Sequence, residues 1–156
     1  MTQDTTPTHV VTCFLLRRDR GREELLLVRR SQRVRTYRGA WGGVSGYVEP
    51  GVAPLEQAYT EIREETGLAR DDAQLLRVGE PLPFHDDELN QSWVVHPFLF
   101  ALLANAAERI LTDWEAVETR WATPAEVATL PTVPKLADAL ALVYPPPAQP
   151  EEVGPA

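Results

Sequence analysis

Apolar runs separated by short polar breaks predict a domain rich in β-strands. Aliphatic and β-branched residues fill positions 10–17 and 24–29, and the polar segment 19–21 ends in Gly21. Short apolar runs of this kind are typical of buried strands, and the brief break between them predicts a hairpin. Pro97 interrupts a later run, so we expect an edge position or a bulge there. Further strands are predicted at 44–48, 73–78, 92–103 and 118–122.

Helical periodicity is clearest between Ala53 and Thr66. Pro54 suits the first turn of a helix, where its missing N–H is not needed, and Gly67 is a suitable C-terminal cap. The apolar residues that recur three to four positions apart predict the face turned to the core: Leu55, Ala58, Tyr59 and Ile62.

Two shorter helices are predicted near the C-terminus. Thr123 is followed by Pro124 and by Glu126, a combination typical of a helix start. A further helix is expected over 134–144. Between the strands, the acidic segment 81–91 is predicted to be a loop.

The order of these elements predicts an α/β fold, with helices on the faces of a mixed sheet. We expect one domain over residues 9–145. Residues 1–8 are predicted to be a disordered lead, and the proline-rich residues 146–156 a disordered tail. No internal repeat or second domain is indicated.

Charge and cysteine content narrow the classes of function. The net charge of −8 argues against binding to nucleic acid polymers or to anionic membranes, which require basic surfaces. No apolar run approaches the roughly 20 residues that a membrane span needs. The N-terminus lacks the pattern of a secretory signal, and Cys13 is the only cysteine, so a cytoplasmic protein with a buried structural thiol is predicted.

Three carboxylates near the end of the predicted helix are the strongest sign of chemistry. Glu61, Glu64 and Glu65 are three and four positions apart and therefore share one helical face. They crowd the last turn, where the helix dipole disfavours anions. Such a cluster of hard oxygen ligands predicts a Mg²⁺ or Mn²⁺ site. The alternative is a solvated helix end, because a like-charge pair at this spacing destabilises a helix by only about 0.2–0.5 kcal/mol.

Residues 46–68 resemble the Nudix box, a motif in which a glycine, a Glu, an Arg-Glu pair and a Glu-Glu pair stand at fixed spacing. Gly46 matches the first glycine, and the later positions match at Glu61, Ile62, Glu64, Glu65, Gly67 and Leu68. Two positions depart from the motif: Val52 stands where the first Glu is expected, and Thr60 where the Arg is expected.

The resemblance implies a Nudix-like α/β/α sandwich and hydrolysis of a pyrophosphate linkage in a nucleotide-derived substrate. It implies that Mg²⁺ (or Mn²⁺) is held by Glu61, Glu64 and Glu65, with the Gly46 carbonyl as a further ligand. The same glutamates would be the catalytic residues. A base supplied from a loop is also possible, and Glu115 and Glu118 are the candidates. A homodimer is possible, because many relatives are dimers.

The two departures keep other functions open. In the family, the Arg helps to orient the neighbouring catalytic Glu, and here both members of the Glu–Arg pair are absent together. Removing both partners of a buried pair leaves no uncompensated charge, whereas losing one would. We therefore expect a retained metal site with a changed position of Glu61. A catalytically weak nucleotide-binding or regulatory module, or a different activity on a phosphorylated metabolite, are the alternatives.

Substrate contacts are predicted from a basic loop and from aromatic residues. The candidates for phosphate binding are Arg29, Arg33, Arg35 and Arg38, and the candidates for stacking on a base are Trp93, Phe84 and Tyr37. A solvated basic loop is an equal alternative for the arginines. Packing in the core is the alternative for the tryptophan.

Overall fold

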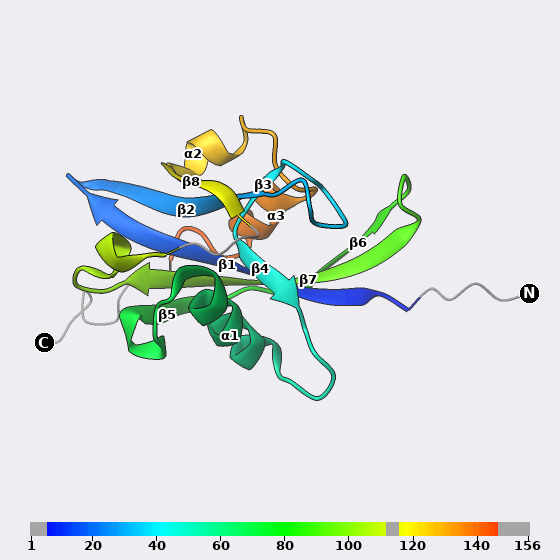
Figure 1. Cartoon of the computed structure of the whole chain (residues 1–156), viewed down its shortest axis with the longest axis horizontal. Helices are drawn as coiled ribbons and strands as arrows, with labels where there is room; N and C mark the ends of the chain where they lie inside the picture. Colours follow the sequence, from blue (N-terminus) through cyan, green and yellow to red (C-terminus); the bar gives the residue numbers. More distant parts are fainter. Residues whose placement is uncertain (1–5, 112–115, 147–156) are drawn as a thin grey trace, which may run out of the picture.

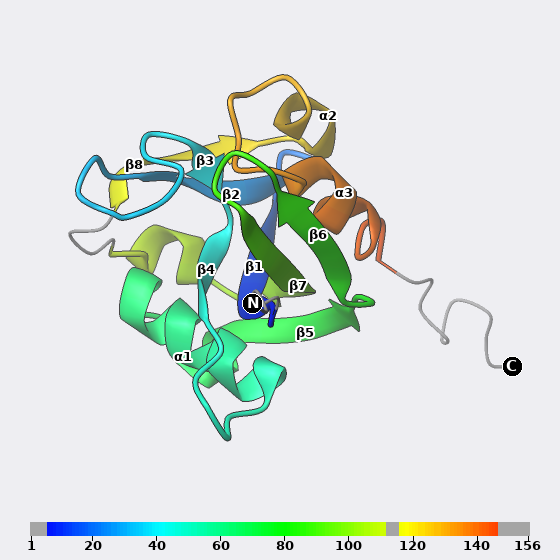
Figure 2. The ribbon, with the colours of Figure 1, turned by 90° about the vertical axis from the view of Figure 1, so that its right-hand side faces the viewer.

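The computed structural model describes residues 6–111 and 116–146, and it is built around one mixed sheet (Figure 1). Eight strands in these residues form the sheet, in the order β3-β2-β1-β7-β5, with β4 beside β1, β6 beside β7 and β8 beside β2. Helix α1 covers one face, whereas α2 and α3 cover the other (Figure 2). The predicted α/β/α arrangement with a mixed sheet is confirmed.

The N-terminal hairpin forms the centre of the sheet. Strand β1 (Thr8–Asp19) and strand β2 (Arg22–Arg30) pair in antiparallel register, with Asp19 opposite Arg22. The two-residue turn between them places Arg20 at φ 53° and Gly21 at φ 80°. Positive φ at both turn positions matches the right-handed twist of the flanking strands. The predicted hairpin is confirmed, with strands longer than the apolar runs.

The other elements follow along the chain. Strands β1 and β7 are parallel, and the remaining strand pairs are antiparallel. The further strands are β3 (Trp41–Gly42), β4 (Val44–Tyr47), β5 (Ala73–Val78), β6 (Leu82–Asp86), β7 (Gln91–Leu102) and β8 (Ala116–Ala122). The helices are α1 (Pro54–Thr66), η1 (Arg70–Asp72), η2 (Ala106–Arg109), α2 (Pro124–Val127) and α3 (Leu136–Ala141).

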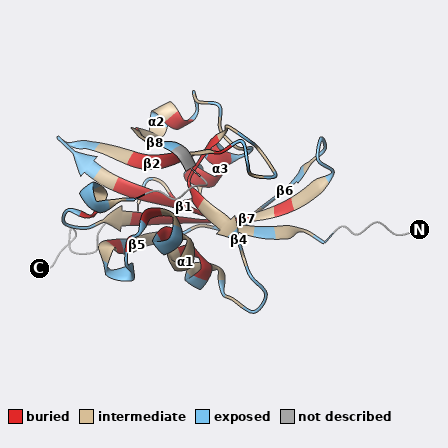
Figure 3. Cartoon of the chain, viewed as in Figure 1, coloured by how far each residue is buried: buried red, intermediate tan, exposed pale blue. Residues whose placement is uncertain are grey.

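Alternation along the central strands divides the core into two clusters, one on each face of the sheet (Figure 3). In β1, Val11, Cys13 and Leu15 contribute to the cluster that includes residues of α1. The residues between them, Phe14 and Leu16, contribute to the cluster beneath α2 and α3. Successive side chains of a strand point to opposite faces, so a continuous apolar run supplies both clusters.

Helix α1 begins and ends where its capping residues indicate. Pro54 lies in the first turn, and Gly67 follows the last at φ 78°, donating its N–H to the Arg63 carbonyl. Only glycine adopts such a left-handed cap without steric cost. The buried side of α1 includes the predicted Ala58 and Ile62, and also two polar residues, Gln57 and Thr66.

Two sequence-based expectations need correction. Of the two alternatives at Pro97, the edge position is wrong because β7 is interior; Pro97 instead lies at an interruption of the ladder, where the antiparallel partner of β7 changes from β6 to β5. A residue without an N–H is tolerated there because the neighbouring strand is interrupted. Residues 81–91 are not a loop throughout, because Leu82–Asp86 form β6, which pairs with β7, and the turn is confined to residues 87–90.

The C-terminal helices are shorter than the pattern predicted. Helix α2 has the predicted capping box between Thr123 and Glu126. Helix α3 covers Leu136–Ala141 instead of 134–144. Among the described residues, no helix is long and apolar enough to cross a membrane. Most of the predicted lead and tail, at 1–5 and 147–156, lies outside the described residues.

Candidate functional site

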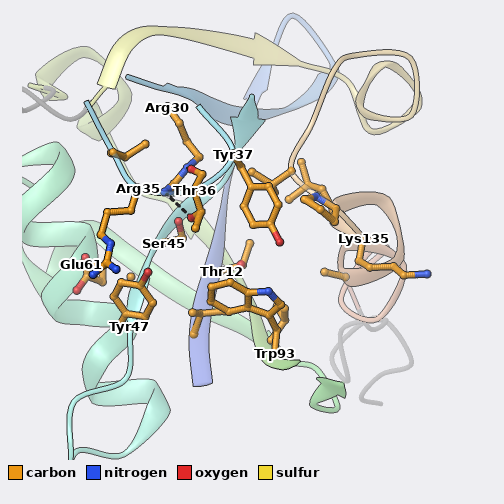
Figure 4. A pocket seen from close by; sticks show the side chains of 18 of the residues that line it. Thr12, Arg30, Arg35, Thr36, Tyr37, Ser45, Tyr47, Glu61, Trp93 and Lys135 are labelled. Atoms are coloured by element: carbon orange, nitrogen blue, oxygen red, sulfur yellow. Dashed lines mark hydrogen bonds between the residues drawn. The ribbon is translucent and has the colours of Figure 1, made fainter. Parts of the chain in front are cut away.

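A cavity of about 640 Å³ opens on the face of the sheet that carries α3 (Figure 4). Its floor consists of side chains from β1, β4 and β7, and its walls come from the segment 30–37, from the end of α1 and from the start of α3. Its polar and aromatic lining residues fall into three groups. We call Gly46, Glu49, Glu61 and Glu64 the acidic end, Arg30, Arg33 and Arg35 the arginine group, and Tyr37, Tyr47, Phe84 and Trp93 the aromatic end.

The acidic end depends on close contact between α1 and β4. Gly46 pairs with Val11, whose side chain lies in the core cluster of α1, so a side chain at position 46 would point toward that helix. A Cβ built on Gly46 would lie 2.2 Å from Cδ of Glu61. The absence of a side chain at Gly46 therefore allows the Glu61 carboxylate to pack against the backbone of β4.

The three clustered glutamates do not all line the same cavity. Glu61 and Glu64 line the large one, whereas Glu65 lines a smaller cavity of about 50 Å³ beside Arg29 and Arg30. Within residues 6–111 and 116–146, no three His, Cys, Asp or Glu side chains are grouped closely enough to hold a metal ion by themselves. The shared helical face therefore places the three carboxylates in one region, but their oxygen atoms do not surround a common position.

The single cysteine lies next to these carboxylates. Cys13 is buried, and its Sγ lies 3.8 Å from the Ala58 carbonyl oxygen. Burial raises the pKa of its thiol well above the usual value, and the negative charges of Glu65 and Glu61 raise it further. The burial expected for Cys13 is confirmed, and a raised pKa favours the protonated, less reactive thiol.

Gln57 is a polar residue of the site that the sequence analysis missed. Its side chain is 2% exposed. The Glu49 N–H donates to Gln57 Oε1 at 3.1 Å, and Gln57 Nε2 donates to Glu61 Oε2 at 2.8 Å. One buried amide thus connects the turn after β4 with the Glu61 carboxylate.

The arginine group comes from the loop that follows β2. Arg30 holds the loop by donating from Nε to the Thr36 carbonyl at 2.9 Å. Arg35 extends toward Glu61 in the close-up view (Figure 4). Arg38 is not among the lining residues and donates from Nε to the Val34 carbonyl at 2.7 Å. Of the four arginines predicted to bind phosphate, Arg33 and Arg35 line the large cavity.

Arg29 and Glu118 are both placed away from the large cavity. They lie opposite each other in the β2–β8 pairing, with 2.5 Å between Arg29 Nη1 and Glu118 Oε1. This ion pair is solvent-exposed, and neither residue is among those that line the cavity. The other candidate base, Glu115, lies outside the described residues.

The aromatic end is assembled from four segments. The Tyr47 and Trp93 rings are nearly parallel, with ring planes 18° apart and centroids 6.4 Å apart, and both line the cavity (Figure 4). The Tyr37 ring is tilted by 50° against Trp93. Trp93 is buried, and in the described part of the chain its Nε1–H has no hydrogen-bond partner. Because this atom is itself closed off from solvent, the aromatic end offers a ligand its ring surfaces rather than this donor.

A hydrogen bond between distant segments holds Tyr37 in the cavity wall. The Tyr37 hydroxyl donates to Asp86 Oδ2 at 2.6 Å. Burial, with Asp86 as a second cause, raises the pKa of Tyr37, whereas the Tyr37 hydrogen bond is the main reason that the pKa of Asp86 is lowered. Both shifts favour a neutral phenol donating to a charged carboxylate. The contact connects the arginine-bearing loop with the end of β6.

Comparison with known proteins decides the family. A model of the NUDIX domain matches residues 6–143 of this chain. The chain belongs to the Nudix family. This Nudix domain places Gly46, Glu61 and Glu64 at the rim of its large cavity, where the box residues of β4 and α1 meet.

Solved structures with the same fold cover nearly the whole Nudix domain. A Caenorhabditis elegans Ap4A hydrolase in a binary complex has a TM-score of 0.71 and 17% identity, covering 86% of this chain and 93% of its own. A MutT protein from Methanosarcina mazei Go1 also has a TM-score of 0.71, with 21% identity and 90% and 94% coverage. The Nudix domain of Shewanella oneidensis NrtR, complexed with ADP ribose, has a TM-score of 0.69, 13% identity and 88% and 86% coverage.

Proposed function

We propose that this protein is a divalent-metal-dependent Nudix hydrolase that cleaves a pyrophosphate linkage in a nucleotide-derived substrate. One observation carries the proposal: a single cavity contains the acidic end, the arginine group and the aromatic end. A nucleoside diphosphate derivative needs these three environments, for the metal, for the phosphates and for the base. The structural neighbours whose names include Ap4A and ADP ribose support a substrate of this kind.

The donors of the acidic end fit Mg²⁺ or Mn²⁺ by their chemistry. Both ions prefer hard oxygen ligands, and Nudix proteins typically use divalent metals. Glu61 and Glu64 would hold the ion, with the Gly46 carbonyl and Glu65 as further ligands. The space that a Cβ at Gly46 would fill supports this assignment, because it brings Glu61 against the backbone of β4. A bound ion supplies charge neutralisation for the diphosphate and makes the attacking water more acidic.

The arginine group would bind the phosphates between the two ends. Arg33 and Arg35 line the cavity, and guanidinium groups form bidentate hydrogen bonds with phosphate oxygens. They would neutralise negative charge that the metal leaves uncompensated and would orient the diphosphate toward Glu61 and Glu64. This assignment keeps Arg33 and Arg35 of the four predicted phosphate ligands, with Arg29 and Arg38 outside the cavity lining.

The aromatic end would bind the base. The nearly parallel rings of Tyr47 and Trp93 both line the cavity, and Tyr47 is 54% exposed, so ring surface is available for stacking on a base. Stacking of a base on aromatic side chains contributes about 1–3 kcal/mol per base and tolerates different bases. The aromatic end therefore supports binding of a nucleotide but does not identify which base it carries.

The proposal is tested by incubating the purified protein with Mg²⁺ or Mn²⁺ and a panel of phosphoanhydrides. The panel contains ADP-ribose, diadenosine tetraphosphate, nucleoside triphosphates and dihydroneopterin triphosphate, and ³¹P NMR identifies the products. We expect cleavage of at least one member, abolished by a chelator and restored by added metal. Glu80→Gln is the matched control, since Glu80 is an exposed carboxylate that does not line the cavity.

Two results would contradict the proposal in different ways. Absence of products with every member, together with tight and saturable binding of one of them, would identify a nucleotide-binding module instead. Cleavage that persists unchanged in the chelator would refute the metal requirement.

A further inference from the structure

We propose that Gln57 is a positioning residue that holds the Glu61 carboxylate in its working orientation. This inference rests on the proposed function, because it assigns Gln57 a role toward the metal site. The family motif has an Arg at the position of Thr60, and neither Thr60 nor Val52 can supply its charge. The structure contains another polar contact to Glu61, and it comes from inside the core.

Burial makes the Gln57 contact costly to lose. Gln57 is 2% exposed, and it shares the buried side of α1 with Ala58 and Ile62. A buried amide destabilises a protein unless its polar atoms are hydrogen-bonded. Both ends of the Gln57 amide have partners, at 3.1 Å and 2.8 Å. A glutamine at this position is therefore held in one conformation by its surroundings.

The orientation of the amide follows from its partners. A backbone N–H can only donate, so the Gln57 atom that faces the Glu49 N–H must be the oxygen. The nitrogen then faces Glu61 and donates to Oε2. If the amide were reversed, its NH₂ group would face the Glu49 N–H, and both groups are donors. The turn after β4 thus determines which hydrogen bond Glu61 receives.

The position of Glu61 is restricted from a second side. The Glu61 carboxylate packs where a Cβ on Gly46 would lie 2.2 Å from its Cδ. Gln57 is four residues before Glu61 on the same helix, so the two side chains are neighbours on one face. The carboxylate is therefore confined between the backbone of β4 and a buried amide.

A neutral donor has a chemical consequence that an arginine lacks. It orders the carboxylate by a hydrogen bond without adding a positive charge of its own beside Glu61. Hydrogen-bonding partners of metal ligands typically contribute about 10–100-fold to metal affinity or activity.

The test compares Gln57→Met with the wild-type protein. Methionine keeps the length of the side chain and removes both hydrogen bonds. We expect Mn²⁺ affinity, measured by electron paramagnetic resonance titration, to fall by about 10–100-fold, and kcat to fall by a similar factor. The KM for the substrate should change much less, because Gln57 is not among the residues that line the cavity.

Two further variants separate positioning from folding. Gln57→Glu keeps the acceptor for the Glu49 N–H and removes the donor to Glu61, so it should also weaken Mn²⁺ binding. Thr66→Val is the matched control on the same helix, since Thr66 is fully buried and donates to the Ile62 carbonyl at 2.5 Å. It should lower the melting temperature without changing Mn²⁺ affinity or kcat.

The outcomes distinguish this inference from the proposed function. If the wild-type protein binds no Mn²⁺ and cleaves nothing, the proposed function and the role of Gln57 both fail. If the wild-type protein is active and both Gln57 variants keep its Mn²⁺ affinity and kcat, the inference alone is overturned. If Gln57→Met does not fold, Gln57→Glu with unchanged Mn²⁺ affinity would overturn it equally.

Discussion

The acidic end and the aromatic end of the cavity are built in different ways. At the acidic end, Glu61 is confined by a buried amide and by the backbone of Gly46. At the aromatic end, Tyr47 is 54% exposed, and Trp93 has a donor without a protein partner. The first arrangement restricts one carboxylate, whereas the second leaves exposed ring surface for a ligand.

This difference indicates a division of labour between chemistry and substrate binding. Groups that act on the reacting phosphate must be held in place before the substrate arrives, because misplacement raises the barrier. Groups that bind the base need only a matching surface. Changes at the acidic end should therefore lower kcat, whereas changes at the aromatic end should raise KM.

The largest effect is expected from Glu64→Gln. Glu64 lines the acidic end, and the substitution removes its charge without changing its size. We expect kcat to fall by at least about a hundredfold in the presence of Mg²⁺, since the role assigned is that of a metal ligand or base. Steady-state kinetics beside Glu80→Gln measures the effect. A kcat equal to that of Glu80→Gln would show that Glu64 is neither a metal ligand nor the base.

Gly46→Ala should act next most strongly. The added Cβ would lie 2.2 Å from Glu61 Cδ, so the carboxylate must move. We expect a loss of about 10–100-fold in kcat and in Mn²⁺ affinity, similar to the loss of a hydrogen-bonding partner. Gly51→Ala is the comparison, because Gly51 has no heavy atom within 4 Å of such a Cβ. Its φ of 80° predicts lower stability without a change in Mn²⁺ affinity. Equal affinities in Gly46→Ala and wild type would contradict the close packing.

Trp93→Ala should separate the aromatic end from the acidic end. Loss of a stacking surface worth about 1–3 kcal/mol raises KM by roughly 5–150-fold. We expect Mn²⁺ affinity without substrate to stay at the wild-type value, which electron paramagnetic resonance titration can measure. Trp93→Phe keeps an aromatic ring and should recover part of the loss. A lower kcat at unchanged KM would show that the two ends do not act separately.

Tyr37→Phe should have a smaller effect. It removes the hydrogen bond to Asp86 and keeps the ring beside Trp93. Asp86 lies at the surface, where solvent weakens the contribution of such a hydrogen bond, so we expect a KM increase of a few-fold and a small drop in melting temperature. A KM increase as large as that of Trp93→Ala would contradict the assignment of Tyr37 to the cavity wall, because it would indicate that the Tyr37 hydroxyl binds the substrate directly.

The same contact predicts a pH dependence. The folded-state pKa of Asp86 lies below its ordinary value of 3.8, so its contribution to stability is present above that value and is lost as the pH falls below it. The pKa of Tyr37 is raised above its ordinary value of 10.0, so the contribution of the neutral phenol is lost only as the pH rises beyond 10.0. The stability difference between wild type and Tyr37→Phe should be constant from pH 5 to 9. Thermal unfolding of both proteins measures it, and a difference that changes within this range would contradict the assignment.

Arg29→Gln should have the smallest effect. Its partner Glu118 lies opposite it in the sheet, and both side chains are exposed. Exposed ion pairs contribute about 0–1 kcal/mol, and neither residue lines the cavity. We expect kcat and KM within about twofold of wild type. A large rise in KM would indicate that Arg29 binds phosphate, as the sequence predicted.

The two ends also differ in how far the sequence predicts them. Residues of the acidic end lie within one strand–turn–helix segment, so the spacing of Gly46, Glu61 and Glu64 along the chain carries the signal. Gln57 was missed because a polar residue on a helix is ordinarily expected to be exposed. Its position one residue before Ala58, inside the buried stripe, was the available sign.

The aromatic end depends on pairing between distant strands. Val10 pairs with both Tyr47 and Val95, two residues from Trp93 along β7, and this register brings the rings to one surface. Tyr37 reaches them through a loop whose path is determined by contacts to Asp86 and by Arg30. Periodicity within single elements contains no information on such pairings, so the sequence named Trp93, Phe84 and Tyr37 as separate candidates and missed Tyr47. The hairpin, α1 and its caps were predictable because their signals are local.

The most direct test of the account is a Mn²⁺ titration of the wild-type protein and of Glu61→Gln, monitored by electron paramagnetic resonance without substrate. Glu61 lines the acidic end and accepts the Gln57 hydrogen bond, so both the metal site and its support depend on it. The account predicts a wild-type site that Glu61→Gln weakens by at least about tenfold, while Glu80→Gln binds like wild type. Equal Mn²⁺ affinity in wild type and Glu61→Gln would contradict the central claim.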